Sequence, residues 1–250
     1  MFLPYAAVFA FGLIIGSFLN VCIYRIPKGK SIVNPPSSCP GCNSQITPVH
    51  NIPVLSYIFL RGRCAYCGTK ISPIYPAIEL LNAVTYIMVA AKFGFDEKSA
   101  LIMALMSVFI VVTFIDLEHK IIPDGITIPG IALGLLLGPL VFKISFINSL
   151  LGVVVGGGLF FLIAVVSRGG MGGGDIKLIA MMGGFIGWKA VLLTIFMGSA
   201  FGATVGIGLM VFKGMHRKTP IPFGPFLVAG AVAAIFWGGG ILEWYGGLHF

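Results

Sequence analysis

Long apolar runs follow one another along most of this chain. A helix needs about 20 apolar residues to cross the hydrocarbon core of a bilayer, and most of these runs approach that length. With 58% hydrophobic and 10% charged residues and a mean hydropathy of +1.03, the chain lies outside the range of soluble domains. We therefore predict an all-α, multi-pass membrane protein with about eight transmembrane helices. The runs lie at about 4–24, 74–91, 99–115, 122–142, 146–167, 176–188, 190–212 and 223–242.

The segment 25–72 is a polar interruption of this pattern. It contains six Lys and Arg residues and no Asp or Glu. Because cytoplasmic loops of membrane proteins carry an excess of Lys and Arg, we predict a cytoplasmic loop here and an N-terminus outside. The chain then divides into a first transmembrane helix at 1–24, the loop at 25–72 and a membrane domain at 73–250. The net charge of +8 reflects this topology and predicts a lipid bilayer as partner, not nucleic acid.

Four of the five cysteines lie in this loop, as two Cys-x-x-Cys pairs. Cys39 and Cys42 form the first pair, Cys64 and Cys67 form the second, and 21 residues separate the two pairs. Four thiolates at this spacing can close a tetrahedral zinc site. The alternative of disulfides or free thiols is disfavoured in the reducing cytoplasm. We predict that the four cysteines bind a structural Zn²⁺, which leaves no open coordination position for catalysis.

Two aspartates stand at the ends of apolar runs. Asp116 ends the third run, and Asp175 opens the sixth after the glycines Gly172, Gly173 and Gly174. An acid at the edge of a bilayer is costly unless it is paired, hydrated or used. Since two complete crossings separate the two aspartates, they are predicted to emerge on the same, cytoplasmic, side.

Two neighbouring aspartates suit the hydrolysis of a peptide bond. Adjacent carboxylates do not both ionise, so one can act as general base for a water while the other polarises the carbonyl. The glycines at 172–174 would let an extended substrate approach Asp175 and would permit backbone angles barred to other residues.

The residues alone leave several assignments open. Asp175 could merely cap its helix, since aspartate is a preferred N-cap residue. The partner acid could be Asp116, Glu118 or Asp124, although Asp116 and Glu118 point to nearly opposite faces of a helix. Lys177 could contact phospholipid or tune Asp175.

Two other classes of function fit parts of the pattern. In an ion-coupled transporter the two aspartates would form a relay, as buried acids often do in such proteins. In a secretion machine, a catalytically inactive membrane protein could use the zinc loop for docking.

Several stretches together resemble the type IV prepilin peptidases, bifunctional membrane enzymes that also serve type II secretion. The resemblance covers nearly the whole chain, whereas the glycine–aspartate motif alone would also fit other intramembrane aspartyl proteases such as presenilins. The stretches are Gly16–Val21 with Arg25 and Pro27, the cysteine pairs around Asn51-Ile52-Pro53, Arg61–Cys64, Tyr75-Pro76 with Glu79-Leu80, Asp116 through Ile122-Pro123-Asp124, and Gly172–Lys177.

The resemblance implies a bacterial inner-membrane enzyme in which Asp116 and Asp175 are the catalytic pair. Its substrates would be prepilins and type II pseudopilins with a short basic leader ending in glycine, cut at the cytoplasmic face. The cysteine loop, which preflagellin peptidases lack, implies a second activity: methylation of the new N-terminal residue, usually Phe, by S-adenosylmethionine. Asn20, Arg25 and Glu79 are candidates for binding that cofactor, and each could equally cap or pair structurally. The oligomeric state is left open.

Overall fold

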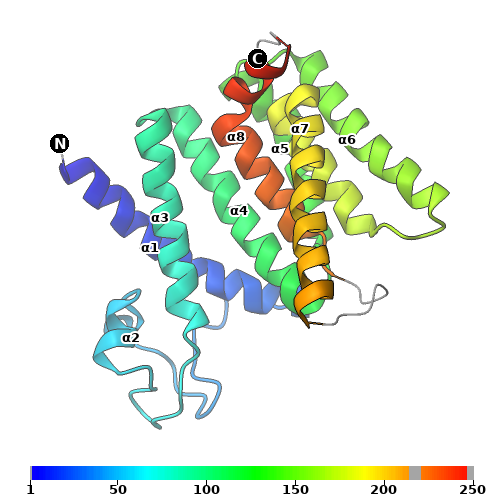
Figure 1. Ribbon diagram of the computed structural model, residues 1–250. Helices are drawn as coiled ribbons and strands as arrows, with labels where there is room; N and C mark the ends of the chain where they lie inside the picture. The colour runs from blue at the N-terminus through cyan, green and yellow to red at the C-terminus, as the bar shows by residue number, and fades with distance from the viewer. Residues whose placement is uncertain (1, 214–220, 247–250) are drawn as a thin grey trace. The chain divides into compact units, whose positions relative to one another are not determined.

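The computed structural model describes residues 2–213 and 221–246, and their regular secondary structure is helical (Figure 1). Seven helices in these ranges are long and apolar enough to cross a membrane. The predicted all-α, multi-pass membrane architecture is confirmed. The seven are α1 (Phe2–Arg25), α3 (Ile74–Phe93), α4 (Glu97–His119), α5 (Asp124–Val141), α6 (Phe146–Val166), α7 (Gly173–Lys213) and α8 (Gly224–Gly246). Shorter helices between α1 and α3 are η1 (Ile26–Lys28), η2 (Pro48–Asn51) and α2 (Leu55–Phe59).

The predicted runs at 176–188 and 190–212 both lie in α7. Gly187 interrupts this helix with φ 78° and ψ 171°, a backbone conformation that glycine adopts without steric penalty. Figure 1 shows the chain turning back within α7, which therefore consists of two helical arms. Eight predicted apolar runs therefore correspond to seven helices, one of them broken.

The chain forms two compact units, one up to Val111 and one from Val112 onward. In the first unit, α1 packs closely on α3 because two glycines of α1 remove side chains at the contact. A Cβ atom at Gly12 would lie 2.7 Å from Ala83 Cα, and one at Gly16 would lie 2.6 Å from Glu79 Cα. The Asn82 amide also donates to the Gly12 carbonyl over 2.8 Å. Small residues and polar side chains of this kind hold helices together in membranes.

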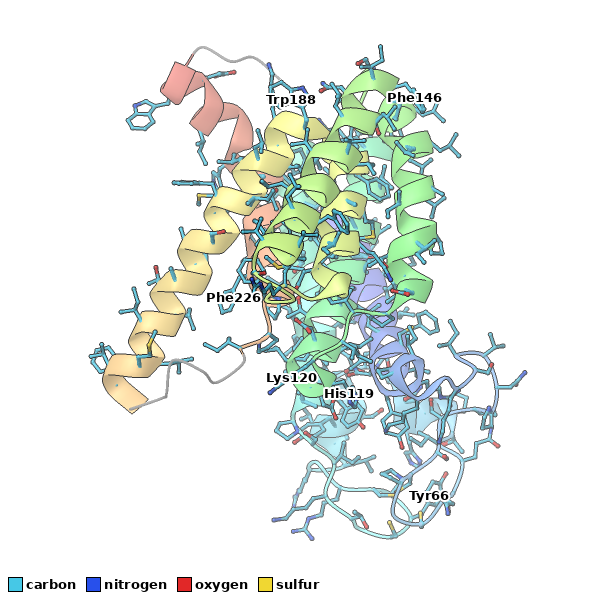
Figure 2. The ribbon with its side chains drawn as sticks, turned by 90° about the vertical axis from the view of Figure 1, so that its right-hand side faces the viewer. Tyr66, His119, Lys120, Phe146, Trp188 and Phe226 are labelled. Atoms are coloured by element: carbon cyan, nitrogen blue, oxygen red, sulfur yellow. The ribbon has the colours of Figure 1, made fainter. Side chains whose placement is uncertain are left out.

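In the second unit, the two arms of α7 pack against different helices. The first arm meets α6 at Gly183, where a Cβ atom would overlap the Gly152 carbonyl. The second arm meets α8 at Gly198, where a Cβ atom would lie 2.9 Å from the Phe226 carbonyl oxygen. Figure 2 shows Trp188, beside the turn of α7, at one end of this unit, and His119 toward the other. The turn thus returns the chain to the end of the unit where α4 stops and α8 begins.

Candidate functional site

Asp116 lies one turn before the end of α4 and faces the protein interior. It is only 5% exposed, whereas Glu118 is exposed. The difference follows from the helix period, which places residues two apart on nearly opposite faces. The Asp116 carboxylate accepts a hydrogen bond from the Gly224 backbone N–H, with 3.0 Å between Oδ2 and N. Asp116 is therefore held in place by the first residue of α8.

Asp175 is the third residue of α7, in its first turn. Its own N–H donates to the Gly172 carbonyl over 3.1 Å. The residue preceding a helix is the usual cap, so Asp175 stands inside the helix and not at the capping position. Its Oδ1 is buried and has no hydrogen-bond partner among residues 2–213 and 221–246. Buried carboxylate oxygens are normally hydrogen-bonded, so this oxygen is available to accept a hydrogen bond from a water or a substrate group.

The two aspartates line the same cavity, which has a volume of about 230 Å³. They lie 59 positions apart in the sequence and interact electrostatically. The predicted convergence of the two acids is therefore present in the structure. Since a water occupies about 30 Å³ of liquid, the cavity has room for a water and a short length of peptide backbone. Its walls are completed by Lys120, Ile121, Ile122, Gly172, Gly173 and Gly174.

The glycines before Asp175 matter for space and not for backbone angle. None of the three has a φ in the left-handed region, so the expectation of unusual backbone angles is wrong. A Cβ atom at Gly174 would lie 2.8 Å from Ile122 Cβ, because α7 begins directly against the chain that connects α4 to α5. A Cβ atom at Gly173 would have no neighbour within 4 Å among the described residues. Gly174 is required by packing, and Gly173 leaves free space at the cavity wall.

Asp124 and Lys177 pair with each other beside the cavity. The Lys177 ammonium lies 2.7 Å from both carboxylate oxygens of Asp124 and thus joins the start of α5 to the first arm of α7. The contact of Lys177 is with Asp124 and not with Asp175. Both side chains are partly exposed, 38% and 57%, and a pair in such a position contributes only about 0–1 kcal/mol.

The four loop cysteines form one compact cluster. Their sulfur atoms all lie within 4.8 Å of one another, and Cys39 Sγ is 3.8 Å from Cys67 Sγ. Tetrahedral zinc with bonds of about 2.3 Å requires sulfur–sulfur distances of about 3.8 Å, so the cluster fits this ion. The fifth cysteine, Cys22, lies outside this cluster and is buried in α1.

The two cysteine pairs are built alike. In the first, the Asn43 N–H donates to the Cys39 carbonyl, and in the second, the Gly68 N–H donates to the Cys64 carbonyl. Asn43 and Gly68 both have left-handed backbones, with φ of 56° and 71°. Each turn thereby directs two sulfurs to a common point.

The surroundings of the thiols differ in their effect on ionisation. The Thr69 hydroxyl, 3.2 Å from Cys67 Sγ, and the Thr69 N–H lower the pKa of Cys67 to about 6. At Cys39 the N–H groups of Cys42 and Gly41 lower the pKa, but burial and the neighbouring thiols outweigh them and raise it to about 11. A metal that binds the four thiolates would therefore release protons.

Comparison with known families identifies both parts of the chain. Residues 10–93 match the bacterial peptidase A24 N-terminal domain, and residues 103–207 match the type IV leader peptidase family. A prepilin leader peptidase/N-methyltransferase of Aeromonas hydrophila is 37% identical over 97% of this chain and 94% of its own length. The chain belongs to the type IV leader peptidase family. Similar proteins of the same name from Bacillus subtilis (strain 168) and Pseudomonas aeruginosa are 36% and 34% identical, over 95% and 94% of the chain and 96% and 90% of their lengths. No solved structure matches significantly.

Asn20 and Arg25, two predicted cofactor-binding residues, make structural hydrogen bonds in this family member. The Asn20 amide donates to the Tyr75 carbonyl over 3.1 Å, which joins α1 to the start of α3. The Arg25 guanidinium donates to the carbonyls of Ser31 and Pro35, at 3.0 and 2.7 Å. Both side chains thus fix the ends of the cysteine loop, and their binding of a methyl donor stays a prediction.

Glu79, the third candidate, is buried in α3 and accepts a hydrogen bond from the Val54 N–H, with 2.7 Å between Oε2 and N. Val54 is a β-branched residue with φ 62°, an outlier for its type. Glu79 therefore anchors a strained turn of the loop to α3. A role in binding the cofactor stays a prediction here too.

Gly224 is the site residue that the sequence analysis did not identify. A Cβ atom there would lie 2.6 Å from Asp116 Oδ2, so only glycine allows the backbone to approach the carboxylate. A signal was present: Gly224 and Pro225 stand at the beginning of the last apolar run, and proline is common in the first turn of a helix. The sequence does not show how α8 is rotated about its axis, and this rotation directs the Gly224 N–H toward Asp116.

Proposed function

We propose that this enzyme removes the leader peptide of prepilins with Asp116 and Asp175 and then methylates the new N-terminus. The observation that carries the proposal is the shared cavity of the two carboxylates. Their place in a chain of the type IV leader peptidase family, whose similar members are named for both activities, supports it. In the proposed division of labour, residues 73–250 carry the peptidase and the loop at 25–72 supports methyl transfer.

The proposed peptidase step needs one ionised and one protonated aspartate. The ionised group takes a proton from water, whose oxygen attacks the scissile carbonyl, while the protonated group donates a hydrogen bond to the carbonyl oxygen. Transfer of a proton to the leaving nitrogen then breaks the C–N bond. The products are a leader with a new carboxylate and a pilin with a free amine, which is the group to be methylated.

The positions of the acids favour hydrolysis over ion transport. Asp116 lies near the end of α4, and Asp175 lies in the first turn of α7. Transporter sites typically lie near the middle of the bilayer, at discontinuous helices. A docking protein without catalysis would leave the cavity that both acids line unexplained.

We also propose a location, substrates and cofactors for the enzyme. The chain lies in a bacterial inner membrane with the N-terminus outside and with the cysteine loop and the cavity at the cytoplasmic face. Prepilins and type II pseudopilins are the proposed substrates and S-adenosylmethionine the methyl donor. Zn²⁺ held by Cys39, Cys42, Cys64 and Cys67 is proposed as a structural ion, and its four-thiolate shell would stiffen the loop.

Incubation of the purified enzyme with a prepilin, with and without S-adenosylmethionine, tests both activities. Intact-mass measurement of the pilin should show loss of the leader in both samples. With the methyl donor present, the mass should also rise by one methyl group at the new N-terminus. An unprocessed prepilin in both samples would refute the peptidase assignment, and cleavage without the methyl group would refute the second activity.

Alanine at Gly173 and at Gly174 should have different consequences. At Gly174 the new methyl group collides with Ile122, so we expect a lower unfolding temperature and slower cleavage. The stability loss should be about 1–3 kcal/mol, as for other overpacked sites. At Gly173 the methyl group has free space, so the unfolding temperature should not fall. Slower cleavage by Gly173→Ala would then report a clash with substrate, and an unchanged rate would show that the substrate backbone does not pass there.

Removal of the metal should affect methyl transfer more than cleavage. The double variant Cys39→Ser/Cys67→Ser should lose bound zinc and N-terminal methylation, because the loop loses the ion that joins its two turns. Cleavage should decline less, since the aspartates lie in the other compact unit. Metal analysis and the intact-mass assay measure both effects. Cys22→Ala, which changes a cysteine outside the cluster, is the control and should retain zinc.

A further inference from the structure

The short helix α2 has its polarity reversed relative to a helix of a soluble domain. Its polar residue Ser56 is buried, with Oγ 3.0 Å from the Val49 carbonyl that it donates to. Its apolar residues Leu55, Ile58 and Phe59 are 51%, 61% and 80% exposed. These three positions share one face of the helix, because residues three and four apart are neighbours on its surface. An apolar face turned outward on a polar loop points to an external partner.

The hydrogen bond between Val54 and Glu79 sets the height of α2 along α3. Val54 directly precedes α2, and Glu79 is the sixth residue of α3. A helix rises about 1.5 Å per residue, so this anchor lies about 7.5 Å inside the beginning of α3. Figure 1 shows α2 level with the first part of α3, and Figure 2 shows Tyr66, between the second pair of cysteines, farther from that helix. α3 is long and apolar enough to cross a membrane, and the anchor lies near its beginning, so the position inferred for α2 is the bilayer surface.

The charges around α2 suit a negatively charged surface. Arg61 and Arg63 follow the helix and are exposed, as are Lys28, Lys30 and Lys70 elsewhere in the loop. The whole segment 25–72 contains no acid. Apolar side chains flanked by basic ones are the features of a segment that binds the interface of an anionic membrane.

We propose that α2 inserts Leu55, Ile58 and Phe59 into the headgroup region of an anionic bilayer and anchors the cysteine loop to the membrane. The favoured partner is lipid and not the prepilin leader, because that leader is expected to be basic and the loop carries only positive charge. This inference is independent of the catalytic role of the aspartates. It gives Glu79 a definite task, which is to hold α2 at the membrane surface.

Photo-crosslinking from position 59 tests the proposal. The intact enzyme with p-benzoylphenylalanine in place of Phe59 is placed in nanodiscs of phosphatidylcholine with phosphatidylglycerol and irradiated. Mass spectrometry of the peptide that contains position 59 should find lipid adducts. The same probe at Tyr66, which is 49% exposed, is the matched control and should give few. Adducts to protein without adducts to lipid, or equal lipid yields at both positions, would overturn the proposal.

A second comparison tests how much charge contributes to the contact between α2 and lipid. The adduct yield at position 59 should fall in nanodiscs of phosphatidylcholine alone, and also after Arg61→Gln/Arg63→Gln. The expected fall is roughly fivefold for each basic side chain that no longer attracts an anionic lipid. Zinc content of each variant shows that the loop is intact. Equal yields with and without the anionic lipid would overturn the anionic part of the proposal. Glu79→Ala should also lower the yield, because it releases α2 from α3.

Discussion

Asn in place of either Asp116 or Asp175 is expected to abolish leader cleavage while the protein still inserts and folds. The amide has nearly the shape of the carboxylate, but it can neither accept a proton from water nor donate one to the leaving nitrogen. Loss of a positioned acid or base slows a reaction by about 10²–10⁴-fold, and the two groups act together. The double variant should therefore be little worse than either single variant. Cleavage of a purified prepilin, followed by intact mass, measures the effect.

The neighbouring acids provide the controls. Glu118→Gln changes an exposed carboxylate on the opposite face of α4, and Asp124→Asn removes the partner of Lys177 outside the cavity. Both variants should cleave at rates close to that of the unchanged enzyme. Methylation of a pilin whose leader is already removed should survive in the Asp116 and Asp175 variants, which shows that they are folded. Normal cleavage by the Asn variant of Asp116 or of Asp175 would refute the assignment of these residues as the catalytic pair.

The fold was largely predictable because the bilayer restricts what an apolar chain can form. Runs of sufficient length must become helices, since the lipid offers no partner for an open backbone. The same rule gave two complete membrane crossings between Asp116 and Asp175, and an even number of crossings places both residues on the same side of the membrane. The two apolar runs separated by Lys189 placed the return of the chain within two residues of Gly187, where it occurs. The sequence did not show that the connection is a sharp kink at a glycine and not a loop, because both would separate the same two apolar runs.

The details of the site depend on helix rotation, which hydrophobic periodicity did not reveal. A transmembrane helix is apolar on the side that faces lipid and on the side that faces protein. The pattern of apolar residues therefore does not show which side of the helix faces the protein interior. Hence the pairing of Lys177 with Asp124 was not predicted. For Asp116 and Glu118, the helix period showed only that the two side chains point to nearly opposite faces of the helix. The cysteine cluster was predictable in full, because its chemistry lies in short spacings and not in the packing of distant helices.

Alanine at Gly224 is expected to reduce leader cleavage by about 10²-fold, the loss that a misplacement of about 1 Å can cause at a catalytic group. The new Cβ atom would stand 2.6 Å from Asp116 Oδ2 and 3.2 Å from Ile122 Cδ1. The neighbouring backbone cannot yield easily, because α8 is packed on the second arm of α7. The carboxylate must therefore move, and its hydrogen bond with the Gly224 N–H lengthens or breaks.

Gly240→Ala is the matched control for this prediction. Gly240 lies in the same helix, and a Cβ atom there would have no neighbour within 4 Å among the described residues. Since alanine favours a helix over glycine by about 1 kcal/mol, this variant should be at least as stable as the unchanged enzyme and equally active. For Gly224→Ala, kcat should fall while the methylation of a processed pilin and the unfolding temperature change little, because the closest collision is with the Asp116 carboxylate and the contact with Ile122 is with the movable end of its side chain. A Gly224→Ala enzyme that cleaves at the normal rate would show that the contact between α8 and Asp116 does not position the carboxylate for catalysis.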